Sequence, residues 1–126
     1  MASRLHCSGA RGRLFAGRKP AETTPFTALL LGAGLPAGVG NVVAGLGTEA
    51  GAALVSHPSV RHITFTGSVS TGIRVALAAA PHITSLTLEL GGKSPLIALA
   101  DCDLEATTNG ALSAIYSNAG QVCSAG

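Results

Sequence analysis

Short β-branched apolar runs alternate with helix-patterned segments through most of the chain, and this alternation constrains the fold more than any other feature. The predicted elements are strands at 39–45, 61–67, 83–92 and 94–100, and helices at 23–34, 48–57, 68–80 and 103–120. For the last helix, either Asp101 or Asp103 is available as the N-terminal cap. Strands that alternate with helices of this length indicate βαβ units, so we expect an α/β fold with a mainly parallel sheet.

The stretch from Pro25 to Thr48 contains no charged residue and is apolar enough to be considered as a membrane span. A spanning helix needs about 20 continuous residues. Glycines and a proline interrupt this stretch at its middle, and both residue types disfavour a helix interior. We therefore favour a buried helix followed by a buried strand, and we expect no membrane association.

The first 18 residues differ in composition from the rest, because they carry four arginines and no acidic residue. An arginine-rich, acid-free start is typical of an organelle transit peptide, and the alternative is a start unrelated to the following domain. The rest of the chain shows no comparable cluster of basic residues, so nucleic-acid binding is not favoured. We expect a cytoplasmic protein, with a mitochondrial location as the alternative.

Two glycine-containing loops compete as a dinucleotide-binding turn. Residues 45–50, "GLGTEA", fit the G-x-G-x-x-G/A pattern, but no acid follows between Gly51 and Leu88 to bind a ribose. Residues 67–72, "GSVSTG", also lie between a strand and a helix, where Ser68 and backbone amides would hold a pyrophosphate. The acid suited to a ribose lies upstream, at Glu22.

The cysteines Cys7, Cys102 and Cys123 form no C-x-x-C pair, so neither a disulfide framework nor a metal site is expected. His57 and His62 have no cysteine or acidic residue close by in the sequence that would complete a set of metal ligands. We interpret them as ordinary loop and strand-edge residues. A cysteine near a helix end is usually a buried small apolar residue, so Cys123 needs its motif to suggest chemistry.

Three motifs in order, "FTGS" at 65–68, "LELGGKSP" at 88–95 and "NAGQVCSAG" at 118–126, resemble the NAD(P)-dependent aldehyde dehydrogenase superfamily. The resemblance runs from about Lys19 to Gly126. It implies a Rossmann-like parallel sheet with flanking helices. It also implies three parts: a leader at 1–18, a partial NAD-binding domain at 19–90 and the beginning of a catalytic domain at 91–126.

The resemblance assigns a set of cofactor-binding residues. These are Lys19 and Glu22 at the adenosine ribose, Gly67, Ser68 and Gly72 at the pyrophosphate, and Gly47 and Leu90 close to the cofactor. A carboxylate at the ribose favours NAD over NADP, although NADP remains an alternative.

The same resemblance assigns Cys123 as the nucleophile and Glu89 as the general base. A thiolate adds to an aldehyde to give a thiohemiacetal, loss of hydride leaves a thioester, and a base-activated water releases the acid. The implied substrate is an aldehyde, and the implied full-length parent is a homo-oligomer.

The chain also departs from the family pattern. Members have an asparagine upstream of the position of Lys19 that completes the oxyanion hole, and residues 1–18 contain none. We expect an incomplete enzyme, with a non-catalytic remnant that binds nucleotide or intact subunits as the alternative. A weaker alternative is cofactor-free esterase activity at Cys123.

Overall fold

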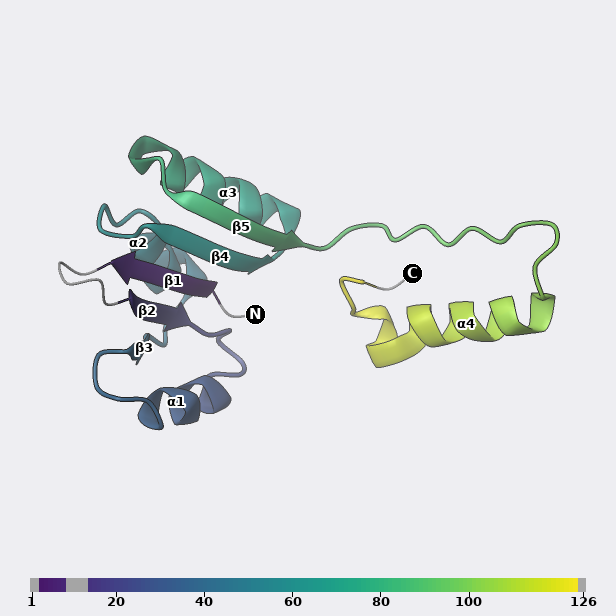
Figure 1. Cartoon of the computed structure of the whole chain (residues 1–126), viewed down its shortest axis with the longest axis horizontal. Helices are drawn as coiled ribbons and strands as arrows, with labels where there is room; N and C mark the ends of the chain where they lie inside the picture. The colour runs from purple at the N-terminus through teal and green to yellow at the C-terminus, as the bar shows by residue number, and fades with distance from the viewer. Residues whose placement is uncertain (1–2, 9–13, 125–126) are drawn as a thin grey trace. The chain divides into compact units, whose positions relative to one another are not determined.

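The structure is a computed structural model that describes residues 3–8 and 14–124, with side chains from Phe15 onward. The chain divides into two compact units, Met1–Glu89 and Leu90–Gly126, and each is described by itself. The first unit contains the sheet and the helices that pack on it, and the second contains one long helix (Figure 1).

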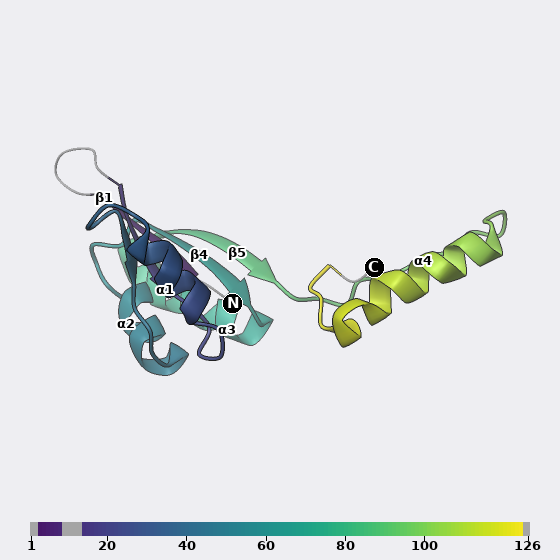
Figure 2. The same ribbon diagram turned by 90° about the horizontal axis from the view of Figure 1, so that it is seen from below.

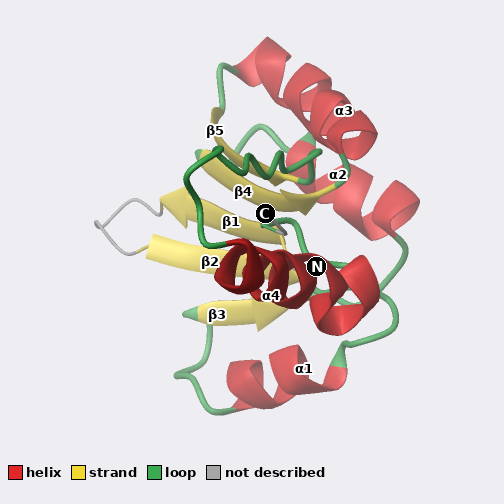
Figure 3. Ribbon diagram, turned by 90° about the vertical axis from the view of Figure 1, so that its right-hand side faces the viewer, coloured by secondary structure: helices red, strands yellow, loops and turns green. Residues whose placement is uncertain are grey.

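The first unit is built on a five-stranded sheet of order β3-β2-β1-β4-β5, seen as a stack of strands in Figure 3. The strands are β1 Ser3–Ser8, β2 Leu14–Lys19, β3 Gly40–Val42, β4 His62–Gly67 and β5 Ser85–Leu90. Strand β2 pairs in parallel with β3, whereas β1 pairs antiparallel with both β2 and β4. Strands β2 and β4 therefore run in the same direction, and β1 runs against them.

Three helices accompany the sheet: α1 Phe26–Ala33, α2 Ala52–Val55 and α3 Val69–Ala79. A π-helical turn, Gly47–Gly51, leads directly into α2, and a 3₁₀ turn, Ala80–His82, follows α3. Helices α2 and α3 lie on the same side of β4 and β5 (Figure 2). The expected alternation of strands and helices in an α/β fold is confirmed.

The antiparallel strand β1 and its neighbour β2 are both absent from the sequence prediction. Residues 3–8 belong to the stretch whose composition we interpreted as a leader, and this interpretation hid its pairing potential. In the structure, Leu5 is the register partner of both Gly17 and Ile63, so β1 joins β2 to β4. A targeting role for residues 1–18 and the boundaries of the three predicted parts stay predictions.

The uncharged stretch 25–48 folds as expected into a helix and a strand, but it is less buried than predicted. Only Ala28 of α1 is buried, and Leu30 is 74% exposed. The reason is that α1 contacts the sheet mainly at the edge strand β3, so most of its apolar surface has no neighbour in this unit. Across the part of the chain that the structure describes, no helix has the length and apolarity to cross a bilayer.

The core of the first unit lies between β4 and β5 on one side and α2 and α3 on the other. It consists of buried Val55, Val60, Ile63, Val75 and Ala79, with Leu54, Phe65, Ala78, Leu86 and Leu88 packed around them. Gly72 and Val75 share the buried face of α3, while Ile73 on the opposite face is 55% exposed. Ile63 is fully buried, so β4 is the centre of this core.

The second unit contains α4, Leu104–Tyr116, and a short 3₁₀ turn, Ser117–Gly120. The Asp103 carboxylate accepts a hydrogen bond from the Ala106 backbone N–H at 3.0 Å, so Asp103 is the cap. The predicted strand at 94–100 is wrong, because this segment has no regular structure. A strand needs a pairing partner, and the five-stranded sheet does not include this segment.

We predict that Ile63→Ala lowers the free energy of unfolding by about 2–5 kcal/mol, because it leaves a cavity at the centre of the core. The matched control is Ile73→Ala, which removes the same atoms from an exposed position and should cost under about 1 kcal/mol. Urea unfolding followed by circular dichroism measures both changes. Equal costs for the two variants would contradict the proposed core.

Candidate functional site

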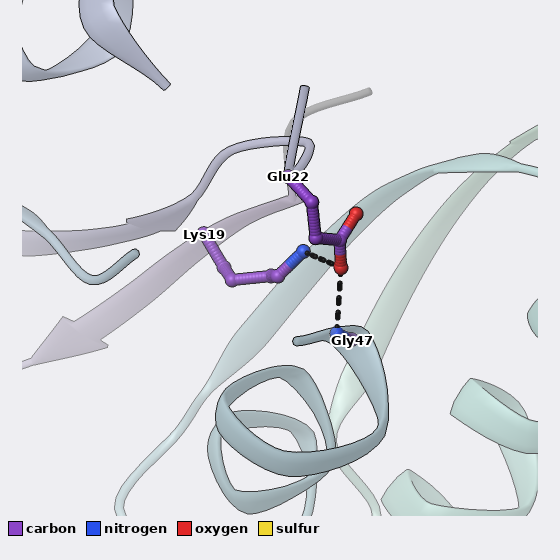
Figure 4. Close-up of polar contacts among 3 residues, drawn as sticks. All are labelled: Lys19, Glu22 and Gly47. Atoms are coloured by element: carbon purple, nitrogen blue, oxygen red, sulfur yellow. Dashed lines mark hydrogen bonds and ion pairs between the residues drawn. The ribbon is translucent and has the colours of Figure 1, made fainter. Parts of the chain in front are cut away.

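The end of β2 holds a hydrogen-bonded group of three residues, drawn in Figure 4. The Lys19 ammonium donates to Glu22 Oε1 at 2.8 Å, and the backbone N–H of Gly47 donates to the same oxygen at 2.8 Å. Lys19 is only 7% exposed, whereas the Glu22 side chain is about half exposed. One carboxylate oxygen therefore links the end of β2 to the turn that begins the π-helix.

These contacts lower the pKa of Glu22 from 4.5 to about 2. The largest cause is the hydrogen bond from Lys19, followed by the backbone N–H groups of Glu22 itself and Gly47. All three favour the ionised carboxylate. Glu22 is therefore an anion throughout the physiological pH range.

The junction between β4 and α3 lies near this group and has the geometry of a helix start. Ser68 caps α3: its hydroxyl oxygen accepts from the Thr71 N–H at 3.3 Å, and it donates to Thr71 Oγ1 at 2.9 Å. A Cβ on Gly67 would lie 2.4 Å from the Phe65 ring, so glycine permits this close turn. The first N–H groups of a helix lack intrahelical partners and attract anions.

A cleft of about 830 Å³ joins these two features within the first unit. Its walls come from the end of β2, the π-helical turn with α2, and the β4–α3 junction. This volume is in the range of ligand-binding clefts in proteins. The cleft contains a fixed carboxylate and a helix N-terminus, which suits a ligand with hydroxyl and anionic groups.

The cleft brings together five of the nine residues predicted as functional: Lys19, Glu22, Gly47, Gly67 and Ser68. Both glycine loops that competed in the sequence therefore face the same cleft. Gly72 does not line it and is buried in α3 instead. Leu90, at the end of β5, is half-buried and also does not line it.

Sequence reasoning missed Arg74, which lines the cleft from the second turn of α3. A signal was available, because Thr71, Arg74, Val75 and Ala78 repeat at the i, i+3, i+4, i+7 spacing of one helix face. Within the described residues, no group of three or more histidine, cysteine or acidic residues could hold a metal ion.

Glu89, the predicted general base, lies on β5 with its side chain exposed. Side chains alternate along the strand, so Leu88 and Leu90 are half-buried while Glu89 is on the other face. Its assignment as a base stays a prediction.

Cys123, the predicted nucleophile, is exposed and free, and it belongs to the second unit. The backbone just before it is unusual, because Asn118, Ala119 and Gly120 all have positive φ. Such conformations are uncommon for residues with a Cβ and are enriched near functional sites. Cys102 is also free and is half-buried, and the side chain of Cys7 lies outside the described residues.

Comparison with known proteins gives a consistent result. Residues 18–126 match the aldehyde dehydrogenase family. The chain is 53% identical over 113 residues to the phenylacetaldehyde dehydrogenase of Pseudomonas fluorescens, covering 86% of this chain and 22% of that protein. It is 50% identical over 112 residues to betaine aldehyde dehydrogenase 1 of Oryza sativa subsp. japonica, covering 85% and 22%. The chain thus spans about a fifth of the length of these relatives.

Solved structures agree with this comparison. An NAD⁺ complex of aldehyde dehydrogenase from Bacillus cereus has a TM-score of 0.79 at 50% identity, covering 86% of this chain and 23% of that one. An NADP-dependent enzyme from E. coli has a TM-score of 0.78 at 45% identity, covering 83% and 23%.

The lowered pKa of Glu22 predicts a specific pH dependence of stability. The folded pKa is below the unfolded value, so the ionised carboxylate stabilises the fold above about pH 4.5, and this stabilisation is lost as the pH falls toward 2. Glu22→Gln should therefore destabilise the chain at pH 7 and have a progressively smaller effect between pH 4.5 and 2. Urea unfolding of both proteins across this range measures it. A difference that does not change with pH would contradict the ionic contact.

Proposed function

The chain belongs to the aldehyde dehydrogenase family, and we propose that it carries the NAD-binding cleft and the nucleophile of an enzyme that oxidises an aldehyde to a carboxylic acid. Members of this family use NAD or NADP. Because the chain spans 22% of the relatives' length, the activity proposed here is that of a complete enzyme containing this sequence.

The observation that carries the proposal is the ionised Glu22 held between Lys19 and Gly47 at the wall of the cleft. A fixed carboxylate accepts hydrogen bonds from both hydroxyls of a ribose. In Figure 4, Lys19 and Gly47 both contact Oε1, and the other carboxylate oxygen points away from these two residues. These features fit the adenosine ribose of NAD.

The helix start at Gly67 and Ser68 supports the same assignment. Its N-terminal amides would hold the pyrophosphate, while Gly67 keeps the backbone free of a side chain. A 2′-phosphate on the ribose would meet the negative charge of Glu22, so NAD is the favoured cofactor and NADP the alternative. Gly72 is buried in α3 and Leu90 ends β5, neither lines the cleft, and their predicted places at the cofactor stay predictions.

The proposed chemistry uses two residues of this chain. The Cys123 thiolate attacks the aldehyde carbon, and its backbone N–H stabilises the resulting oxyanion in a thiohemiacetal. NAD, when bound, supplies the hydride acceptor for the oxidation. The acyl group is then a thioester on Cys123, and Glu89 takes a proton from the water that hydrolyses it. The carboxylic acid leaves and the thiolate is restored.

A second function, nucleotide binding without turnover, is favoured by one observation. Every residue that lines the cleft lies between Lys19 and Ala78, inside the first unit. The cleft is therefore formed within that unit, and neither Cys123 nor Glu89 lines it. We infer a cytoplasmic enzyme that is a homo-oligomer in its complete form, with a mitochondrial location as the alternative.

The cofactor assignment predicts that Glu22→Gln changes the preference between the two dinucleotides. Removing the negative charge should raise the ratio of NADP to NAD affinity by roughly tenfold, because it removes a like-charge contact with the 2′-phosphate. Isothermal titration of the chain with each dinucleotide measures the ratio. Glu49→Gln, a change of the same charge outside the cleft lining, is the control and should leave the ratio unchanged. An unchanged ratio in Glu22→Gln would refute the ribose assignment.

The catalytic assignment predicts that aldehyde-dependent NADH formation requires Cys123. In a complete enzyme containing this sequence, Cys123→Ala should lower turnover by at least about 10³-fold, whereas the control Cys102→Ala should keep it. Phenylacetaldehyde and betaine aldehyde, named in two relatives, are suitable probes. Normal turnover in Cys123→Ala would exclude Cys123 as the nucleophile. The same assay on the 126-residue chain separates the two functions, because nucleotide binding alone gives no NADH.

A further inference from the structure

The charged side chains that line the cleft carry a net positive charge. Lys19 and Glu22 neutralise each other through their ion pair at 2.8 Å. Arg74 is the remaining charged residue of the lining, and its guanidinium has no ion pair within the described part of the chain. The cleft therefore carries one uncompensated positive charge.

Arg74 lies in the second turn of α3, from which a long side chain extends toward the start of the helix. It lies six residues after the cap Ser68, which is about 9 Å along a helix axis. The Cα–Cβ bonds of a helix tilt toward its N-terminus, so a long side chain covers the surface of the preceding turn. For Arg74 that surface is around Thr71, on the side of the Ser68 cap.

The positive charge of Arg74 and its place near the start of α3 both favour a phosphate group as its ligand. A dinucleotide bound at Glu22 and Ser68 places phosphate oxygens near the first turn of α3. An exposed guanidinium is always protonated and can donate two parallel hydrogen bonds to a phosphate. Arg74 is itself exposed, so it can adjust its side chain without disturbing the core.

We propose that Arg74 contacts a phosphate group of the bound adenine dinucleotide and thereby determines its affinity. The inference rests on the proposed function, because it needs the dinucleotide in this cleft. It adds a residue that none of the recognised motifs contains. Lys19 cannot take this role while its ammonium is buried and paired with Glu22.

The test measures binding of ADP, NAD and adenosine to a complete enzyme containing this sequence by isothermal titration. Arg74→Gln should weaken ADP and NAD by roughly tenfold and leave adenosine unchanged, because adenosine has no phosphate. Arg74→Lys should recover part of the loss, since it restores the charge without the planar donor pair. Added salt should reduce the difference between wild type and Arg74→Gln.

Arg61→Gln is the matched control, because Arg61 is exposed on the same unit but does not line the cleft. It should bind all three ligands like the wild type. If wild type binds ADP and NAD and Arg74→Gln binds them equally well, the role of Arg74 is overturned while the proposed function stands. Equal losses for adenosine and ADP would also overturn it, because Arg74 would then contact the base. A wild type that binds neither ADP nor NAD overturns both proposals.

Discussion

The burial of the Lys19 ammonium is the constraint on which the arrangement of the cleft depends. A lysine that is 7% exposed needs an anionic partner, because an unpaired charge away from water is costly. Glu22, three residues later, is that partner, and its carboxylate also holds the N–H of Gly47 from 25 residues further along. The positions of the strand end and of the π-helical turn are therefore coupled through one side chain. Removing Glu22 would affect the strand end and the turn together.

Much of the first unit could be predicted from local sequence patterns. The strands β4 and β5 and the helix α3 follow from clear periodicity, and they supply most of the core around Ile63. The sequence leaves Asp101 and Asp103 as possible caps, and the hydrogen bond from the Ala106 N–H to Asp103 decides between them. By contrast, β1 and β2 were missed because strand pairing is a long-range property. The same limit explains the wrong strand at 94–100, whose apolar residues have the composition of a strand but no partner in the sheet.

The candidate site was predicted better by motifs than by single residues. The motif "FTGS" predicts the helix start, and the absence of an acid between Gly51 and Leu88 leaves Glu22 as the carboxylate suited to a ribose. The resemblance places residues of both glycine loops at the cofactor, but the hydrogen bond from the Gly47 N–H to Glu22, 25 residues away in the sequence, is not predictable from local patterns. Arg74 was missed because arginine on an exposed helix face is usually solvated, and the helical spacing that it shares with Thr71 and Ala78 does not by itself indicate a cleft.

The two oxygens of the Glu22 carboxylate have different environments. Oε1 accepts the hydrogen bonds from Lys19 and Gly47, while the other oxygen is directed away from these two residues (Figure 4). A hydroxyl that binds the second oxygen leaves the internal contacts of the first intact. The acceptor is thus preorganised, and little side-chain entropy is lost when a ligand arrives. A ligand can therefore bind or leave without breaking the hydrogen bond from Gly47, because the two contacts use different oxygens of the Glu22 carboxylate.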